Sequence, residues 1–368
     1  MDLNGLWELW HWPEGTRKAS PENLDALGEP LAAQVPGNVE LDLFRAGEIP
    51  DPFFGRNFFA LREFEFHEWW YRKRFQAPKE LASQEVELVF EGLDTIATVW
   101  LNGRKLGESA NMLVEQRFEA TGALREGENT LVVRLGSAIN WARQKPYEPL
   151  NFGPEARDEA LWLRKPTHCF GWDIAPRIVS AGIWRPVRLV VRKANAFEQV
   201  YYYTFDASPE KATLGLWFAF RTDAPTLDGF SLRLRGTCGN SSFEKTWGTE
   251  FNRGHLQVNI PSPLLWWPKG YGEPHLYTVT LDLLKDGQVL DTHEERIGLR
   301  TLQLQREERF GERGCFRFYV NNVPIRVLGA NWVPLDAFHS RDEERVEQVI
   351  DLFDDLGCQM IRCWGGGV

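Results

Sequence analysis

The first half of the chain alternates polar and apolar side chains over short stretches, a pattern typical of half-buried β-strands. Residues 85–90 read Glu-Val-Glu-Leu-Val-Phe, and residues 129–135 form a second strand-like stretch. Between two further strand-like stretches stand Asn102 and Gly103, a pair that tolerates positive φ and is typical of a two-residue hairpin. Many short strands separated by Gly and Pro predict an antiparallel β-sandwich or jelly roll over residues 1–194.

A second β-rich region extends from residue 195 to residue 300. Its strand candidates are residues 214–221, 231–234, 255–260, 277–284 and 289–296. About 100 residues with short strands at regular spacing predict an immunoglobulin-like β-sandwich, although the Cys…Trp…Cys pattern of antibody domains is absent. Residues 264–268 read Leu-Leu-Trp-Trp-Pro and are predicted to lie at an edge or in a loop, because Pro cannot donate to a central ladder.

From residue 301 the period of the apolar positions changes. Residues 325–328 are predicted to form a strand, and Ser340 is predicted to begin a helix with Glu343 as its capping-box partner. The apolar stripe of that helix has helical spacing and comprises Val346, Val349, Ile350, Phe353 and Leu356. Gly357 stands where the helix should end, and residues 359–363 form the next strand. The order strand, helix, strand predicts a parallel βαβ unit.

One βαβ unit cannot complete a parallel sheet, because each parallel strand needs neighbours and helices must cover both faces. Residues 301–368 are therefore predicted to be the truncated start of a larger α/β domain, and the chain a fragment of a larger enzyme. In a (β/α)8 barrel the chemistry takes place at the carboxyl ends of the strands. Those ends carry four side chains that could bind a substrate, and these are Asn331, Trp332, Arg362 and Trp364.

Two of these four side chains, Arg362 and Trp364, also have a structural explanation. Arg362 could bind a carboxylate or sugar hydroxyls, but a structural ion pair inside a barrel fits almost as well. Trp364 could stack on a sugar ring, and packing inside a barrel is the alternative. The 16 Trp and 24 Phe of the chain suit sugar rings, yet the cores of β-sandwiches account for most of them.

Composition excludes several classes of partner. A formal net charge of −10 argues against nucleic acid, and no apolar run reaches the length that a membrane span requires. The five cysteines are odd in number and scattered, which predicts reduced thiols. Together with a first segment that lacks the features of a signal peptide, they predict a cytoplasmic location, with a processed precursor as the alternative.

Motifs for other chemistries are absent. The sequence holds neither a His-Glu-x-x-His pattern nor a Gly-x-Ser-x-Gly elbow, and Cys358 and Cys363 lack the spacing of a zinc knuckle. His168 and Cys169 could indicate a reactive thiol, but a buried cysteine beside a structural histidine is the favoured interpretation. No metal site is predicted from these patterns, and no pair of carboxyl groups stands out as acid and nucleophile.

Several stretches resemble glycoside hydrolase family 2. Residues 69–75 and 90–103 resemble the sugar-binding jelly roll of the family, and residues 182–189 resemble the closing strand of that domain. Residues 266–272, with Pro-His-Leu-Tyr at 274–277, resemble the immunoglobulin-like second domain. The resemblance covers essentially the whole chain.

Two stretches resemble the β-mannosidases within that family. Residues 360–367 end in Trp-Gly-Gly-Gly, where the β-galactosidases and β-glucuronidases have a Ser-His-Tyr-Pro type of segment. Residues 170–177 resemble a Phe-Gly-Trp-Asp-Trp-Gly-Pro-Arg loop that in the β-mannosidases reaches the active site and offers its Asp to the terminal sugar. This chain has Ile174 and Ala175 in place of Trp-Gly. The resemblance assigns substrate contacts to Trp172, Asp173, Arg362 and Trp364. It places Asn331 and Trp332 at the rim of the barrel.

The resemblance implies a glycoside hydrolase that releases terminal β-D-mannose from non-reducing ends with retention, without metal or organic cofactor. Retention uses two carboxyl groups about 5–5.5 Å apart. In the family both are Glu residues on later barrel strands, beyond Val368, so no catalytic residue is assigned here and the chain alone is expected to be inactive. The partner would be an oligosaccharide with terminal β-mannose, and the oligomeric state stays open. The alternatives are a non-catalytic carbohydrate-binding protein and another family 2 exo-glycosidase, such as a glucosaminidase.

Overall fold

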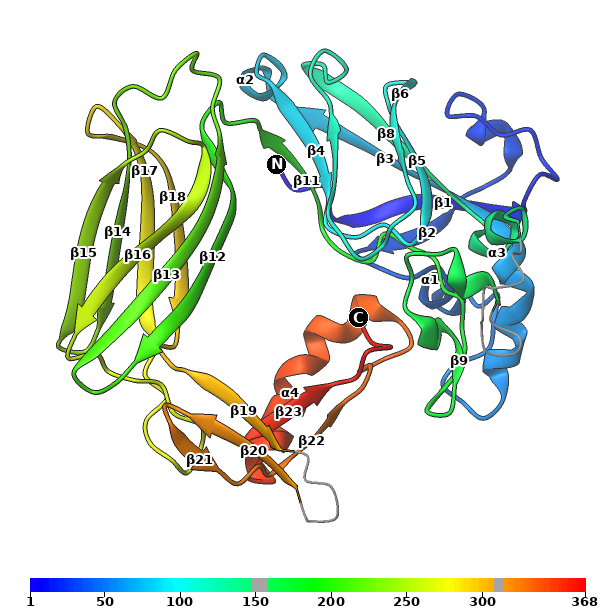
Figure 1. Cartoon of the computed structure of the whole chain (residues 1–368). Helices are drawn as coiled ribbons and strands as arrows, with labels where there is room; N and C mark the ends of the chain where they lie inside the picture. The colour runs from blue at the N-terminus through cyan, green and yellow to red at the C-terminus, as the bar shows by residue number, and fades with distance from the viewer. Residues whose placement is uncertain (147–157, 308–313) are drawn as a thin grey trace. The chain divides into compact units, whose positions relative to one another are not determined.

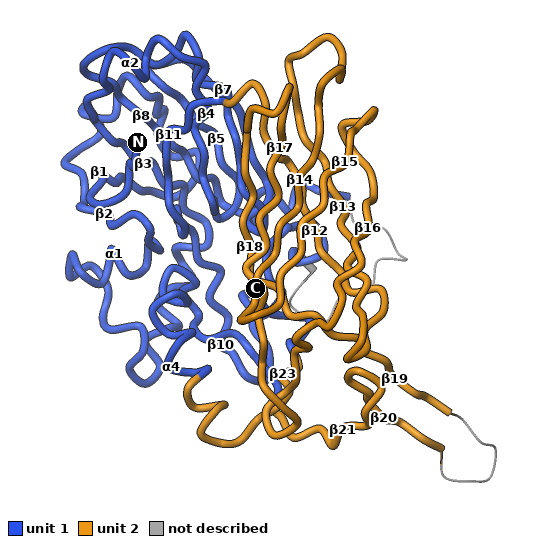
Figure 2. The backbone as a smooth tube through the Cα atoms, turned by 90° about the vertical axis from the view of Figure 1, so that its left-hand side faces the viewer, with its two compact units in different colours: residues 1–192, 331–350, 363–368 blue, residues 193–330, 351–362 orange. Residues whose placement is uncertain are grey.

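The structure is a computed structural model, and it describes residues 1–146, 158–307 and 314–368. The chain divides into two compact units (Figure 2). The first unit contains residues 1–192, 331–350 and 363–368, and the second contains residues 193–330 and 351–362. Each unit is built around its own β-sandwich. Among the described residues, no helix is long and apolar enough to cross a membrane.

The first unit holds two antiparallel sheets (Figure 1). The larger sheet consists of β1 (Gly5–Pro13), β2 (Leu31–Val35), β3 (His67–Ala77), β5 (Ile96–Leu101), β6 (Arg104–Ser109) and β8 (Gly127–Gly136), in the order β2-β1-β3-β8-β5-β6. The smaller sheet consists of β4 (Val86–Phe90), β7 (Gln116–Glu119) and β11 (Val187–Val191), in the order β11-β4-β7. The predicted strands at 85–90 and 129–135 are confirmed.

The larger sheet is apolar on both faces. One face shares a core with the smaller sheet and includes Trp69 and Tyr71. The opposite face carries a second cluster with Trp10 and Trp70. Adjacent residues of β3 therefore enter different cores, as the two-residue period of a strand requires. The predicted hairpin joins β5 to β6, with φ of 53° at Asn102 and 78° at Gly103.

Short helices and one small hairpin surround this sandwich. The helical segments are η1 (Leu24–Leu27), α1 (Val39–Arg45), η2 (Asn57–Phe66), α2 (Lys79–Ala82), α3 (Ala138–Arg143), η3 (Asp158–Leu161) and η4 (Thr167–Cys169). The hairpin follows η4 and consists of β9 (Phe170–Trp172) and β10 (Ala175–Arg177).

The second unit contains a sandwich of two antiparallel sheets around one apolar core. One sheet consists of β12 (Ala196–Ala207), β13 (Lys211–Arg221) and β16 (Arg253–Pro261), in the order β12-β13-β16. The other consists of β14 (Phe230–Cys238), β15 (Ser241–Gly248), β17 (Tyr277–Lys285) and β18 (Gln288–Ile297), in the order β15-β14-β17-β18. The predicted β-sandwich over this region is confirmed.

The sequence missed two strands of this sandwich. The register of β12 shifts between Phe197 and Gln199 and again between Thr204 and Asp206, so its apolar positions lose the two-residue period. At the edge of its sheet, β15 is polar and largely exposed. Residues 264–268 lie outside the ladders apart from an isolated bridge at Trp266, as the proline predicted.

A three-stranded antiparallel sheet and a strand–helix–strand segment complete the chain. The sheet consists of β19 (Leu302–Glu307), β20 (Cys315–Val320) and β21 (Val323–Ile325). The segment consists of β22 (Gly329–Trp332), η5 (His339–Arg341), α4 (Asp342–Asp355) and β23 (Met360–Cys363). β22 and β23 pair with each other. The N–H of Met360 donates to the carbonyl of Leu328, and the N–H of Trp364 donates to that of Trp332, so the strands run parallel.

Two predicted boundaries are wrong. The strand predicted at 325–328 lies at Gly329–Trp332, because residue 326 donates its N–H to Tyr271 Oη instead of to a ladder. A Cβ at Gly329 would lie 2.0 Å from the carbonyl oxygen of Met360, so pairing can begin there only with glycine. The helix begins at Asp342, not Ser340, because the Ser340 N–H donates to Asn38 Oδ1 (3.1 Å) within a 3-10 turn.

The apolar stripe predicted for α4 is present, and Val346, Ile350 and Leu356 are exposed. No residue of α4 is buried. Ile350 is 43% exposed and Leu356 is 70% exposed. Gly357, with φ of 72°, ends the helix as predicted. An apolar helix face of this kind normally packs against a sheet or another helix.

Candidate functional site

Two of the predicted site residues lie at the tip of the β9–β10 hairpin. Phe170 anchors its base and is 2% exposed, whereas Trp172 is 37% exposed and Asp173 is exposed in the turn. The hairpin pairs Trp172 with Ala175 and Phe170 with Arg177. The local sequence therefore buries one end of the hairpin and presents an indole and a carboxylate at the other.

The same tip contacts the residue that follows β23. The rings of Trp172 and Trp364 lie 5.5 Å apart between centroids, at 53° to each other. The N–H of Trp364 donates to the carbonyl of Trp332 over 2.9 Å, and both of these tryptophans are half-buried. The structure thus brings the Trp172 and Trp364 rings together and joins Trp364 to Trp332 through the main chain, although these residues come from distant parts of the sequence.

Gly366 makes room for the Trp364 ring. A Cβ built at Gly366 would lie 2.4 Å from the indole, closer than real atoms approach. The glycine run after β23 thus allows a side chain to fold back on the main chain.

The other two predicted residues are exposed on the paired strands. Asn331 lies in β22 and Arg362 in β23. Arg362 belongs to the second compact unit, whereas Asn331, Asp173 and the three tryptophans belong to the first.

A buried ion pair lies near the base of the hairpin. The Lys165 ammonium contacts the Asp94 carboxylate, and the side chains are 0% and 3% exposed. Lys165 Nζ also donates to the carbonyl oxygen of Ser180 over 2.9 Å. The Ser180 hydroxyl donates to Glu40 Oε2 over 2.6 Å. Burial raises the pKa of Glu40 to about 7, and the Ser180 hydrogen bond opposes part of that shift.

A second ion pair holds the far strand of the hairpin. The Arg177 guanidinium donates to Glu65 Oε2 over 2.7 Å through Nη2 and to Oε1 over 3.0 Å through Nε. Glu65 is buried and Arg177 is 12% exposed at its side chain. Such a forked pair fixes the orientation of both groups. The base of the hairpin is therefore held on both strands.

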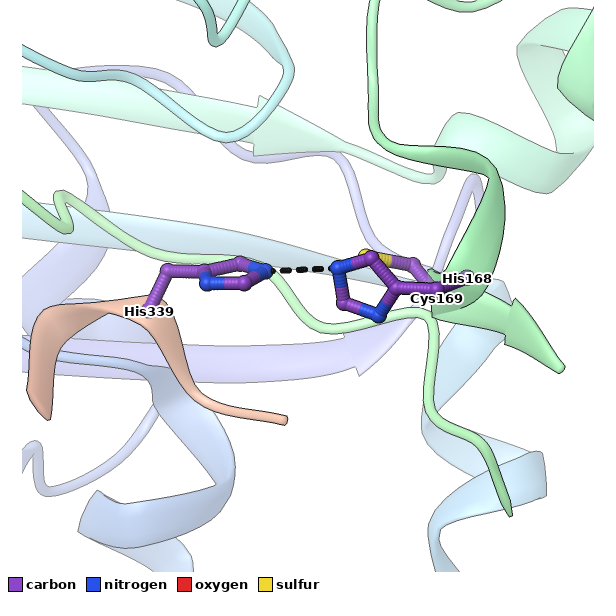
Figure 3. Close-up of side chains that lie close together, drawn as sticks. All are labelled: His168, Cys169 and His339. Carbon is purple, nitrogen blue, oxygen red and sulfur yellow. Dashed lines mark hydrogen bonds between the residues drawn. The ribbon is translucent and has the colours of Figure 1, made fainter. Parts of the chain in front are cut away.

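His168, Cys169 and His339 form a compact buried cluster (Figure 3). His168 Nε2 and His339 Nε2 lie 3.0 Å apart, and Cys169 Sγ lies 3.9 Å from His168 Nε2. Burial lowers the pKa of His168 to about 3 and raises that of the Cys169 thiol to about 12. At neutral pH the imidazole is uncharged and the thiol protonated, so Cys169 is not an activated nucleophile. The structural interpretation of this cysteine is confirmed.

Sequence reasoning missed the rest of this polar interior. His168 and Cys169 were singled out, but nothing local connects them with His339, which is 171 residues away from His168. Lys165 and Asp94 are separated by 71 residues. Charged side chains of this kind are usually exposed, so a sequence pattern gives no signal for a buried pair.

Buried carboxyl groups in the described parts of the chain have structural partners. The pairs are Glu40 with Ser180, Asp42 with Arg45, Glu65 with Arg177, Glu68 with Arg134, Asp94 with Lys165, Asp282 with Arg233, and Asp336 with Arg345. A carboxylate that already binds a cation or a hydroxyl is poorly placed to act as an acid or a nucleophile. The site is thus rich in aromatic and hydrogen-bonding groups and suits binding of a polar ring.

Family models match both sandwiches. Residues 14–185 match the model described as "Glycosyl hydrolase 2 galactose-binding domain-like", and residues 199–300 match the model described as "Glycosyl hydrolases family 2". The chain therefore belongs to glycosyl hydrolase family 2, as the resemblance of its motifs indicated.

Named relatives include several β-mannosidases. Beta-mannosidase B of Thermothelomyces thermophilus is 33% identical over 346 residues, which is 91% of this chain and 40% of the relative. The crystal structure of a β-D-mannosidase from Dictyoglomus thermophilum superposes with a TM-score of 0.86 at 32% identity and covers 100% of this chain and 44% of that one. A β-glucuronidase from Bifidobacterium dentium, at 20% identity and a TM-score of 0.67 (98% of this chain, 56% of that one), shares the fold. The chain spans about 40% of the curated relatives that it matches.

Proposed function

We propose that this chain is the N-terminal part of an exo-acting β-mannosidase that releases terminal β-linked mannose with retention. Residues 1–194 would form the sugar-binding-like domain, residues 195–300 the immunoglobulin-like domain, and residues 301–368 the first βαβ unit of a (β/α)8 barrel. The parallel pairing of β22 with β23 through α4 supports the barrel assignment. The exposed apolar side chains of Val346 and Ile350 on α4 also support it, because further barrel elements would bury them.

The contact between Trp172 and Trp364 is the observation that carries the proposal. It brings a hairpin of the first domain to the carboxyl end of a parallel strand, where barrel enzymes bind their substrates. Trp172 and Trp364 would stack on the sugar ring, and Asp173 would accept hydrogen bonds from its hydroxyls. Asn331 and Trp332 would complete the rim, and Arg362 is a further candidate for sugar binding. The acid/base and the nucleophile would lie in the part of the relatives' length that this chain does not span.

Activity assays on two lengths of protein test the proposal. The purified 368-residue chain should not hydrolyse an aryl β-D-mannoside, whereas the protein extended by the rest of its reading frame should. Turnover by the short chain would show that the catalytic groups are already present. An extended protein that hydrolyses β-glucosaminides but not β-mannosides would refute the substrate assignment and favour the glucosaminidase alternative.

Substitution of Asp173 tests the site itself. A hydrogen bond to a charged group contributes about 1.5–3 kcal/mol, so Asp173→Asn in the extended protein should lower kcat/KM by about 10- to 100-fold. Ile174→Ala is the matched control, because Ile174 is 54% exposed on the same turn and carries no polar group. Equal effects of the two substitutions would argue against a direct role for the carboxylate.

Binding without chemistry is the second candidate, and a groove supports it. A cavity of about 1020 Å³ lies on the outer face of the larger sheet and is lined by Trp70, Trp100 and Trp141. The Trp70 and Trp100 rings stack 5.6 Å apart at 15°. If the 368-residue chain is itself a binding module, it should bind mannosides, and Trp100→Ala should abolish that binding. Undiminished binding by Trp100→Ala would exclude this groove as the binding surface.

A further inference from the structure

We propose that His168, Cys169 and His339 bind a zinc ion. The three side chains are 2%, 3% and 5% exposed, and the atoms that would ligate the ion all lie within 4.8 Å of one another. Two imidazoles and one thiolate are a donor set that zinc prefers, and the cluster offers no carboxylate or carbonyl donor of the kind that magnesium and calcium require. In the described parts of the chain, this is the one group of three or more His, Cys, Asp or Glu residues with such spacing.

Two of the three ligand separations fit a tetrahedral ion with small adjustments. Zn–N bonds of about 2.0–2.1 Å and a Zn–S bond of about 2.3 Å place two nitrogens about 3.3 Å apart and nitrogen and sulfur about 3.6 Å apart. The observed separations are 3.0 Å between the two Nε2 atoms and 3.9 Å between Cys169 Sγ and His168 Nε2. The third separation, between Cys169 Sγ and His339 Nε2, is at most 4.8 Å. The first two pairs therefore need shifts of a few tenths of an ångström, and the third needs a shift of up to about 1 Å, to admit the ion. A water molecule would supply the fourth ligand.

A carboxylate fixes one of the imidazoles in the orientation that a metal requires. Asp342 Oδ2 lies 2.7 Å from His339 Nδ1, so the carboxylate accepts the Nδ1 proton and leaves a lone pair on Nε2. That lone pair faces His168 and Cys169 (Figure 3). Carboxylates that hold a ligating histidine in this way are typical of zinc sites. A simple packing interaction would not need this arrangement.

The charges around the cluster are compatible with a cation. The nearby Lys165 ammonium would repel zinc, but it is paired with Asp94. Binding releases the Cys169 thiol proton, while His168 keeps its single proton and carries it on Nδ1 instead of Nε2. The Cys169 thiolate and the Asp342 carboxylate together balance the two positive charges of zinc.

The ion would connect two distant segments of the first unit. His168 and Cys169 belong to η4, directly before the hairpin that presents Trp172, and His339 belongs to η5, directly before α4. Zinc would therefore fix the base of the hairpin against the start of the helix. Its role would be structural, because the three ligands are buried and the exposed candidate residues lie at the hairpin tip.

Metal analysis and cobalt substitution test the site in the full 368-residue chain. After incubation with zinc and gel filtration, the chain should retain one zinc ion, measured by elemental analysis. Cobalt(II) in its place should give the visible bands of a tetrahedral ion and a thiolate-to-cobalt charge-transfer band. Cys169→Ser and His339→Gln should each weaken zinc binding by at least about tenfold. Cys169→Ser should remove the charge-transfer band, and His339→Gln should remove the tetrahedral spectrum.

His67→Gln is the matched control. His67 Nδ1 lies 3.0 Å from His11 Nδ1, and Glu48 lies 3.1 Å from His11 Nε2, so this pair has the same kind of contacts without a thiol. His67→Gln should keep its zinc. Zinc retained undiminished by Cys169→Ser, or zinc lost equally by His67→Gln, would overturn the assignment. If the variants do not fold, the cobalt spectrum of the unaltered chain decides, and its absence refutes the site.

Discussion

The buried pair of Lys165 and Asp94 gives a sharp test of how the first unit is stabilised. Lys165→Met removes the cation and leaves the carboxylate of Asp94 in a site where both side chains are almost wholly buried. The simplest way to remove this unpaired buried charge is to protonate Asp94. Protonating a carboxyl group of ordinary pKa about 3.9 costs about 4 kcal/mol at pH 7. That value agrees with the roughly 3–5 kcal/mol expected when one partner of a buried ion pair is lost.

The pH dependence distinguishes this mechanism from lost packing. In Lys165→Met, the folded state binds a proton that the unfolded state does not. The loss of unfolding free energy relative to the unaltered chain (the deficit) should therefore shrink by about 1.4 kcal/mol for each unit that the pH falls from 7 towards 5. Asp94→Asn leaves the Lys165 ammonium unpaired in the folded state. Deprotonation of this buried ammonium costs less free energy as the pH rises. The deficit of Asp94→Asn should therefore shrink from pH 7 towards pH 9, opposite to that of Lys165→Met.

Urea unfolding followed by tryptophan fluorescence measures these deficits. Twelve of the sixteen tryptophans lie in the first unit, so fluorescence reports chiefly on the unit that contains the pair. Lys105→Met is the control, because Lys105 and Glu108 form an ion pair whose side chains are 51% and 64% exposed. That substitution should cost less than about 1 kcal/mol. A deficit for Lys165→Met that is equally small, or that does not change with pH, would refute the reasoning.

Two further predictions concern groups near the same site. Because the folded-state pKa of Glu40 is raised to about 7, the contribution of this group to the free energy of unfolding should be lost as the pH rises from about 4.5 to 7. Glu40→Gln should therefore flatten this part of the stability–pH curve in urea titrations. An unchanged curve would contradict the prediction. Gly366→Ala should displace the Trp364 ring, which its Cβ would meet at 2.4 Å. In the extended enzyme it should raise KM for aryl mannosides, whereas Gly365→Ala, with open space around its Cβ, should not.

The accuracy of the sequence predictions depended on how local their physical causes are. The β5–β6 hairpin was predicted because Asn102 and Gly103 themselves supply the positive φ values that the turn needs. The end of α4 was predicted for the same reason, since Gly357 supplies the left-handed residue. The start of α4 was missed because Asn38, some 300 residues away in sequence, binds the Ser340 N–H.

The candidate site was only partly accessible to sequence reasoning. The resemblance to a known family selected Trp172 and Asp173, and the strand pattern selected Trp332 and Trp364, but neither indicated that the Trp172 and Trp364 rings meet. The cluster of His168, Cys169 and His339 depends on a tertiary contact, and only two of its members are adjacent in sequence. Such groups become visible only when the fold is known.

The described contacts explain how an exposed loop can hold a defined position. Its base is fixed by the Arg177–Glu65 pair on β10 and by the buried cluster that precedes β9, while the tip carries the exposed Trp172 and Asp173. Binding residues on a loop depend on such a rigid support. The departure from the family pattern at Ile174 and Ala175 falls at the tip and not at the base. It therefore changes the surface offered to a ligand and leaves the contacts that position Trp172 in place.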